Sequence, residues 1–269
     1  MSTVYLLYVY AAGLGLAVGS FLNVVVFRYH SGRGVSGRSF CPHCAHKLVW
    51  YDLVPVVSFL LLRGKCRYCR AKISWQYPLV ELATALSFLL AFREFFVSPR
   101  DMLSIVQFSF YIIALPLLIA IVAYDLKHKI IPDGLVYSFV GLSLLFRFVQ
   151  MSGGFFATSA LLDLAAGPLL FLFFFLFWFG SDGKWMGLGD AKLGLGIGWM
   201  LGLWGGVSAV IFGFWFGAVF GILSIVLSHM LKARERRVTM KSEVPFAPFL
   251  VAGIFAATFT HFSVLSLGF

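Results

Sequence analysis

Charged residues are scarce in this sequence. They make up 12% of its 269 residues, whereas hydrophobic residues make up 61%. Soluble domains carry about 25% charged residues, and a water-soluble fold of this length could not bury so much apolar surface. Segments of about 20 mostly apolar residues, each long enough to cross the hydrocarbon core of a bilayer, recur along the chain. The composition therefore excludes an ordinary soluble domain and predicts an all-α polytopic membrane protein.

Acidic residues are scarcer still, with 11 Asp and Glu against 21 Lys and Arg and a net charge of +10. In a soluble protein this excess would suggest a nucleic-acid partner. Here the basic residues lie in loops beside apolar segments, which is the pattern that sets membrane orientation. We therefore expect no nucleic acid, and we expect these loops to lie close to anionic membrane lipid.

The apolar segments predict about eight transmembrane helices, at residues 4–27, 77–97, 103–124, 134–150, 158–180, 191–204, 206–230 and 247–267. The sixth is short, so a tilted, broken or re-entrant segment is an alternative there. The first lacks a basic n-region and a cleavage site, so we expect it to be a retained helix.

Four basic loops fall on one side of the membrane if the chain has eight spans. The positive-inside rule places that side in the cytoplasm and both termini outside. The loops are residues 28–76, 125–133, 181–192 and 231–243.

All four cysteines lie in the first of these loops, as Cys41-Pro-His-Cys44 and Cys66-Arg-Tyr-Cys69. Two such pairs form the knuckles of a tetrahedral zinc site. Disulfides are disfavoured in the cytoplasm, and iron–sulfur clusters more often show other spacings. The sequence thus predicts structural zinc, which would supply folding free energy to a loop too small for its own core. Gly64 suits the turn before the second pair.

Two aspartates, Asp125 and Asp190, fall at the cytoplasmic ends of predicted helices and so at one depth in the bilayer. Carboxylates beside hydrocarbon are costly, so a functional role is the default hypothesis. Two neighbouring carboxyls that share a proton can activate water and polarise a peptide carbonyl. Gly187 and Gly189 would let backbone or substrate approach closely. A functional role for the two aspartates, as a pair that activates water, is therefore the working hypothesis.

Other interpretations stay open at this point. A short GxGD motif is weak in a chain with 27 glycines, and Asp125 could instead pair with a neighbouring lysine. Asp133 is interpreted as a helix-start charge, Asp182 as a solvated loop residue, and Asp163 as a poor partner because it lies nearer the outer side. Intramembrane carboxylates also fit a transporter, but no repeated halves are visible.

Six motifs in order resemble the bacterial type IV prepilin peptidase family over nearly the whole chain: GSFLNVVVFR (19–28), CPHC…CRYC (41–69), ISWQYPLVELATA (73–85), YDLKHKIIPD (124–133), GLGDAKL (187–193) and PFAPFL (245–250). The resemblance implies a multi-pass enzyme of the bacterial inner membrane with its active site facing the cytoplasm. It would remove the basic leader of type IV prepilins or type II secretion pseudopilins. The family's catalytic aspartates map onto Asp125 and Asp190.

The resemblance further implies N-methylation of the new N-terminal residue by S-adenosylmethionine, an activity associated with the cysteine loop and with the position of Gly64. A peptidase whose zinc serves only to fold the loop is the alternative, because no glycine-rich S-adenosylmethionine fingerprint is present. Within the matched motifs, Lys192 is a candidate for supporting catalysis. Asn23 and Glu81 either anchor helix packing or contact the methyl donor.

Together these predictions divide the chain into a first helix (1–28), a cytoplasmic zinc-binding loop (29–76) and a membrane-embedded peptidase core (77–269). They leave the oligomeric state open.

Overall fold

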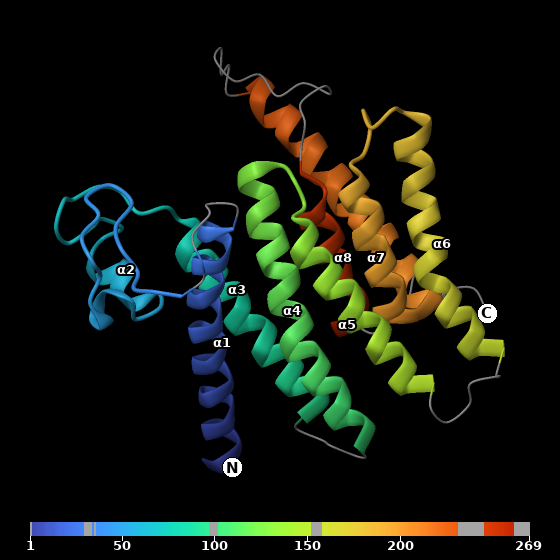
Figure 1. Ribbon diagram of the computed structural model, residues 1–269, viewed down its shortest axis with the longest axis horizontal. Coiled ribbons are helices and arrows are strands. Elements are labelled where there is room, and N and C mark those ends of the chain that lie inside the picture. The colour runs from blue at the N-terminus through green and yellow to red at the C-terminus, as the bar shows by residue number, and fades with distance from the viewer. Residues whose placement is uncertain are drawn as a thin grey trace. The chain divides into compact units, whose positions relative to one another are not determined.

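The structure is a computed structural model that describes residues 2–29, 34, 36–96, 102–151, 158–230 and 245–260. Across these residues the regular elements are helices (Figure 1), which confirms the all-α prediction. They are α1 (Ser2–Arg28), η1 (Trp50–Asp52), α2 (Val57–Leu61), α3 (Gln76–Ala91), η2 (Phe92–Phe96), α4 (Met102–His128), α5 (Asp133–Met151), α6 (Thr158–Gly180), α7 (Leu188–Met230) and α8 (Ala247–Phe259).

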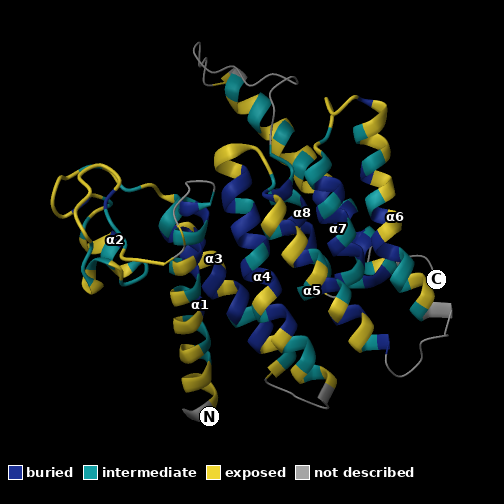
Figure 2. Ribbon diagram, in the orientation of Figure 1, coloured by how far each residue is buried: buried dark blue, intermediate teal, exposed yellow. Residues whose placement is uncertain are grey.

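Five of these helices, α1, α4, α5, α6 and α7, are long and apolar enough to cross a membrane. Figure 2 shows many exposed residues along α1 and α6. Many of the exposed side chains are large and apolar, as on α6, where Leu169, Leu172 and Leu176 are exposed. Such surfaces suit lipid rather than water, so the chain has the features of a multi-pass membrane protein. The count of eight spans stays a prediction. Helices α3 and α8, with 16 and 13 residues, are not among these candidate spans, and residues 261–267 of the last predicted span lie outside the described residues. The basic loop at 231–243 lies outside them too.

The chain forms two compact units, Met1–Ala123 and Tyr124–Phe269. In the first unit α1 packs on α3 through small residues. A Cβ atom at Gly15 would lie 2.7 Å from the Cα of Ala85, and one at Gly19 would lie 2.7 Å from the Cα of Glu81. Glycine thus lets the two backbones touch, as is common between membrane helices. In the second unit α5, α6 and α8 pack on α7.

Helix α7 is broken at Gly202, whose φ of 74° and ψ of −175° are not helical. A straight helix of its 43 residues would be about 65 Å long, roughly twice the hydrocarbon thickness. The chain instead reverses direction at the break. A Cβ atom at Gly206 would lie 3.4 Å from the Cα of Gly198, whereas two residues eight apart in a straight helix are about 12 Å apart. We call residues 188–201 the first arm and residues 203–230 the second arm. The break lies close to the boundary predicted between the sixth and seventh spans.

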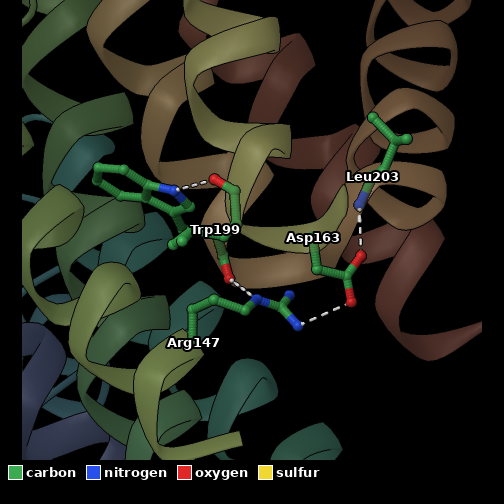
Figure 3. A network of polar contacts seen from close by, with 5 residues as sticks. Arg147, Asp163, Trp199 and Leu203 are labelled. Carbon is green, nitrogen blue, oxygen red and sulfur yellow. Dashed lines mark hydrogen bonds and ion pairs between the residues drawn. The ribbon is translucent and has the colours of Figure 1, made fainter. Parts of the chain in front are cut away.

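A polar network surrounds this break (Figure 3). Arg147 of α5 donates from Nε to the backbone oxygen of Trp199, at 2.9 Å, and from Nη1 to Oδ2 of Asp163 on α6, at 3.3 Å. The other oxygen of Asp163 accepts the backbone N–H of Leu203 at 3.0 Å. A carbonyl that ends the first arm and an N–H that begins the second arm are thereby satisfied, as a break within a membrane requires.

Replacing the buried Arg147 by Ala should destabilise the protein. The change leaves the Trp199 carbonyl and the Asp163 carboxylate without this donor, at a cost on the order of 2–4 kcal/mol. Thermal unfolding in detergent measures the effect. The exposed Arg93 in η2 provides the control, since Arg93→Ala should change stability by less than about 0.5 kcal/mol. Equal unfolding temperatures for Arg147→Ala and the parent would show that the network does not hold the break.

Candidate active site and metal centre

Asp125 lies in the last turn of α4, and its side chain is buried, with 5% of the residue exposed. Its carboxylate accepts a hydrogen bond from the backbone N–H of Ala247. Ala247 is the first residue of α8 and belongs to the late PFAPFL motif. The positive N-terminal end of α8 therefore faces the carboxylate, an arrangement that stabilises negative charge.

Asp190 lies in the first turn of α7 and is 8% exposed. The backbone N–H of Gly187 donates to its Oδ2 atom at 3.2 Å, and the Asp190 N–H donates back to the Gly187 carbonyl at 3.1 Å. An acidic side chain that reaches back to the N-cap N–H is one half of a capping box. This contact orients the carboxyl and places it at a second helix N-terminus.

The structure brings the two aspartates together within the second unit. The carboxyl of Asp190 lies close enough to Asp125 for the charge of Asp125 to act on it. Each is buried, and each meets the N–H groups of a helix start. The sequence-based expectation that Asp125 and Asp190 lie near one another is therefore met in this unit.

Gly189 explains how the two segments approach one another. A Cβ atom at this position would lie 2.8 Å from the Cβ of Ile131, which follows α4 in the same motif as Asp125. At Gly187 the nearest atom would be Oδ2 of Asp190, at an ordinary 3.6 Å. The close approach expected for both glycines is thus required at Gly189 and not at Gly187.

Lys192 forms an ion pair with Asp133, with 2.5 Å between Nζ and Oδ1. Its ammonium also lies 4.9 Å from the ring centroid of Tyr137. Asp133 is the first residue of α5, where a helix-start charge is expected. The pair links the start of α5 to the start of α7, so Lys192 supports the position of the segment that bears Asp190.

The four cysteines form one cluster, in which the Sγ atoms all lie within 4.8 Å of one another. The Sγ atoms of Cys41 and Cys69, one from each pair, are 3.9 Å apart. Tetrahedral zinc with Zn–S bonds of about 2.3 Å would separate its sulfur ligands by roughly 3.8 Å. All four thiols are free of disulfide bonds. The cluster therefore fits a divalent metal.

The two cysteine pairs form matching turns. The Cys41 carbonyl accepts the Ala45 N–H at 2.8 Å, and the Cys66 carbonyl accepts the Arg70 N–H at 3.0 Å. The fifth residue of each turn has a positive φ, 56° at Ala45 and 61° at Arg70. A hydrogen bond from the backbone N–H of Cys69 lowers the pKa of Cys66 to about 7, whereas the pKa of Cys69 is raised to about 11, so Cys66 is the first of the two thiols to ionise.

Gly64 ends the short helix α2. Its φ is 66°, its N–H donates to the Phe59 carbonyl at 2.9 Å, and its own carbonyl accepts the Ile73 N–H at 2.8 Å. A side chain here would be strained by the backbone and would press on the Phe59 ring, 3.1 Å from a Cβ atom. Gly64 thus shapes the approach to the second cysteine pair.

Asn23 and Glu81 both join elements of the first unit. The Asn23 amide donates to the Tyr77 carbonyl at 3.0 Å and so ties α1 to α3. Glu81 accepts the N–H of Val56 at 2.7 Å, and Val56 has a positive φ of 59°. Glu81 therefore anchors the cysteine loop to α3. Contacts of this kind are expected if Asn23 and Glu81 anchor helix packing, which is one of the two roles predicted for them from the sequence.

The structure thus shows an all-α membrane protein with a buried carboxyl pair and a four-cysteine centre, and comparison with known proteins shows the same class. Residues 14–95 match the bacterial peptidase A24 N-terminal domain, and residues 112–222 match the type IV leader peptidase family. The chain belongs to the type IV leader peptidase family, which confirms the resemblance found in the sequence.

Relatives of similar length carry the same family name. The prepilin leader peptidase/N-methyltransferase of Stutzerimonas stutzeri is 33% identical over 270 residues, covering 89% of this chain and 86% of the relative. The protein of that name from Pseudomonas aeruginosa is 32% identical over 273 residues, with coverage of 89% and 86%. That from Vibrio cholerae is 34% identical over 200 residues, with coverage of 71% and 76%. No solved structure matches the chain.

Sequence reasoning missed the contacts that assemble the site. The sequence alone indicates no role for the PFAPFL motif, yet this motif supplies the N–H that faces Asp125. The sequence indicates only a helix-start charge at Asp133, yet this residue also forms an ion pair with Lys192. One signal was available, because a basic residue in the GLGDAKL motif and an acid in the preceding aspartate motif are complementary.

Replacing Gly189 by Ala should lower the unfolding temperature. The added methyl group would press on Ile131, and overpacking of this kind costs about 1–3 kcal/mol. A matched control is Gly141→Ala in α5, where a Cβ atom would meet nothing within 4 Å. That change should be neutral or stabilising, because alanine favours a helix more than glycine does. The close approach would be refuted if Gly189→Ala unfolded at or above the temperature of the parent.

Proposed function

We propose that this protein cleaves the leader peptide of type IV prepilins or type II secretion pseudopilins, with Asp125 and Asp190 as its catalytic pair. One observation carries the proposal: two buried carboxyls from distant segments lie near one another, close enough that the charge of Asp125 acts on Asp190, at the ends of apolar helices. Membership of the leader peptidase family and the names of the relatives support the substrate class.

In the proposed reaction one carboxyl is ionised and the other is protonated. The ionised group takes a proton from water as the water oxygen attacks the scissile carbonyl carbon, while the protonated group donates a hydrogen bond to the carbonyl oxygen. Collapse of the tetrahedral intermediate breaks the C–N bond, and the departing amine takes up a proton from the pair. The N–H groups of Gly187 and Ala247 hold the two carboxyls in place throughout.

We further propose that the protein lies in the bacterial inner membrane with about eight spans and an active site that faces the cytoplasm. The two aspartates end α4 and begin α7, where apolar helices meet the basic loops at 125–133 and 181–192. The positive-inside rule assigns those loops to the cytoplasm. The chain then divides into a first helix (1–28), a cytoplasmic metal loop (29–76) and a membrane-embedded peptidase core (77–269).

The four cysteines are proposed to bind structural zinc. The spacing of the Sγ atoms fits tetrahedral coordination by four thiolates, which leaves no open position for water. Zinc would therefore stabilise the loop rather than act on the peptide bond. Cysteines on the cytoplasmic side stay reduced and available for metal.

N-methylation of the new N-terminus is proposed as a second activity, because the relatives are named prepilin leader peptidase/N-methyltransferase. S-adenosylmethionine would supply the methyl group when bound. The anchoring of the cysteine loop by Glu81 and the turn at Gly64 would serve this activity by fixing the loop on α3. Cleavage without methylation is the competing outcome.

Substitution of either aspartate by Asn should abolish cleavage of a purified prepilin, with a loss of about 10³-fold or more, because neither step proceeds without both carboxyls. Asp182→Asn is a matched control in an exposed turn and should cleave normally. Gel analysis of the product measures cleavage, and thermal unfolding shows that each variant is folded. Normal cleavage by Asp125→Asn or Asp190→Asn would exclude the pair as the catalytic group.

Replacing Cys66 by Ser should release the metal and impair methylation more than cleavage. Metal analysis of the purified protein should show one zinc in the parent and less in the variant, because removing one thiolate opens the coordination shell. Mass spectrometry of the product N-terminus reports methylation. His43→Ala should keep its zinc, since four thiolates suffice. A parent free of metal refutes the zinc site, and an unmodified product amine from the zinc-loaded parent identifies a peptidase without methylation.

A further inference from the structure

The cysteine loop carries large apolar side chains that its own small core does not use. In α2 only Phe59 is buried. Its ring packs against the ring of Trp75, with 4.9 Å between the two ring centroids. Around it Trp50 is 78% exposed, Leu61 is 77% exposed and Trp75 is 67% exposed. The six exposed residues Trp50, Leu53, Val57, Leu60, Leu61 and Trp75 define what we call the apolar face of the loop.

These side chains belong to elements that contact one another. Helix α2 packs against η1, which brings residues 57–61 beside residues 50–52. Phe59, which contacts both Trp75 and the turn at Gly64, forms the support beneath them. Large exposed apolar surfaces outside the spanning helices mark a site of interaction with a membrane or another protein.

The position of α2 within the first unit favours the membrane. In Figure 1 α2 lies level with the C-terminal part of α1 and not beyond the end of that helix. Helix α1 is a candidate membrane span that ends at Arg28. The loop therefore turns back along the spanning helix, and Figure 2 shows that α2 remains largely uncovered there.

The charge of the loop also fits a lipid surface. Five exposed basic residues follow α2 in the sequence: Arg63, Lys65, Arg67, Arg70 and Lys72. The one acid of the loop, Asp52, is already paired with Arg67, at 2.8 Å between Nε and Oδ1. An apolar face with tryptophans, beside clustered Lys and Arg, is the composition of segments that rest in the headgroup region of anionic membranes.

We propose that the apolar face of the cysteine loop inserts into the headgroup–acyl boundary of the bilayer that α1 spans, with the basic residues on anionic headgroups. The metal centre is then held at the membrane surface by two attachments. One is the contact of Glu81 with Val56, and the other is lipid around Trp50, Leu61 and Trp75. The loop is a peripheral membrane element rather than a free cytoplasmic lobe.

Site-specific photo-crosslinking in the full-length protein tests this proposal without any assay of cleavage. A photoreactive amino acid replaces Leu61 in one variant and the exposed His43 of the first cysteine pair in another. Both variants are reconstituted in vesicles that contain phosphatidylglycerol, and their metal content is checked against the parent so that a misfolded loop is recognised. After illumination, mass spectrometry identifies what is attached at each position.

The proposal predicts phospholipid adducts at position 61, several-fold more than at position 43, and fewer when phosphatidylglycerol is replaced by a zwitterionic lipid. Equal lipid labelling at the two positions would overturn it, as would the absence of lipid adducts at position 61 in a variant with the metal content of the parent. Attachment of a co-reconstituted prepilin at position 61 in place of lipid would also overturn it and would identify the face as a substrate surface.

Discussion

Burial of two carboxyl groups beside hydrocarbon is the constraint on which the second unit of this protein depends. An ionised carboxylate removed from water is unstable unless donors surround it. Here the donors are backbone N–H groups at helix starts, from Ala247 of α8 for Asp125 and from Gly187 before α7 for Asp190. These N–H donors stabilise the buried acids. The helix ends that carry the two acids also lie close enough for the charge of Asp125 to act on Asp190.

The helices that carry these groups need fixed ends. Ile131, in the segment after α4, packs directly against Gly189 at the start of α7, and this contact determines how closely the two segments lie. At the opposite end of the first arm, Arg147 and Asp163 satisfy the backbone groups that the break at Gly202 would otherwise leave unpaired. In a membrane such groups have no water to bind. The arm that bears Asp190 is thus fixed at one end by a close apolar contact and at the other end by polar contacts.

Local patterns in the sequence predicted much of this. The cysteine spacing defines the metal cluster because each pair closes its own turn, and the apolar runs define the helices because each satisfies its own backbone. Contacts between distant segments could not be predicted in this way. The pairing of Lys192 with Asp133 and the approach of Ala247 to Asp125 depend on how the helices pack. The sequence gives no sign of the role of Arg147, because its acceptor is a backbone carbonyl. The Trp199 carbonyl needs a side-chain donor only because the helix is broken at Gly202.

The central claim is that Asp125 and Asp190 form one catalytic pair. An electron cryo-microscopy map of the protein in a lipid nanodisc would measure the separation of their carboxyl groups directly. The account predicts carboxyl oxygens no more than about two hydrogen-bond lengths apart, roughly 6 Å, so that one water can bridge them. Carboxyls in different leaflets, or too far apart for one peptide bond to lie between them, would contradict it.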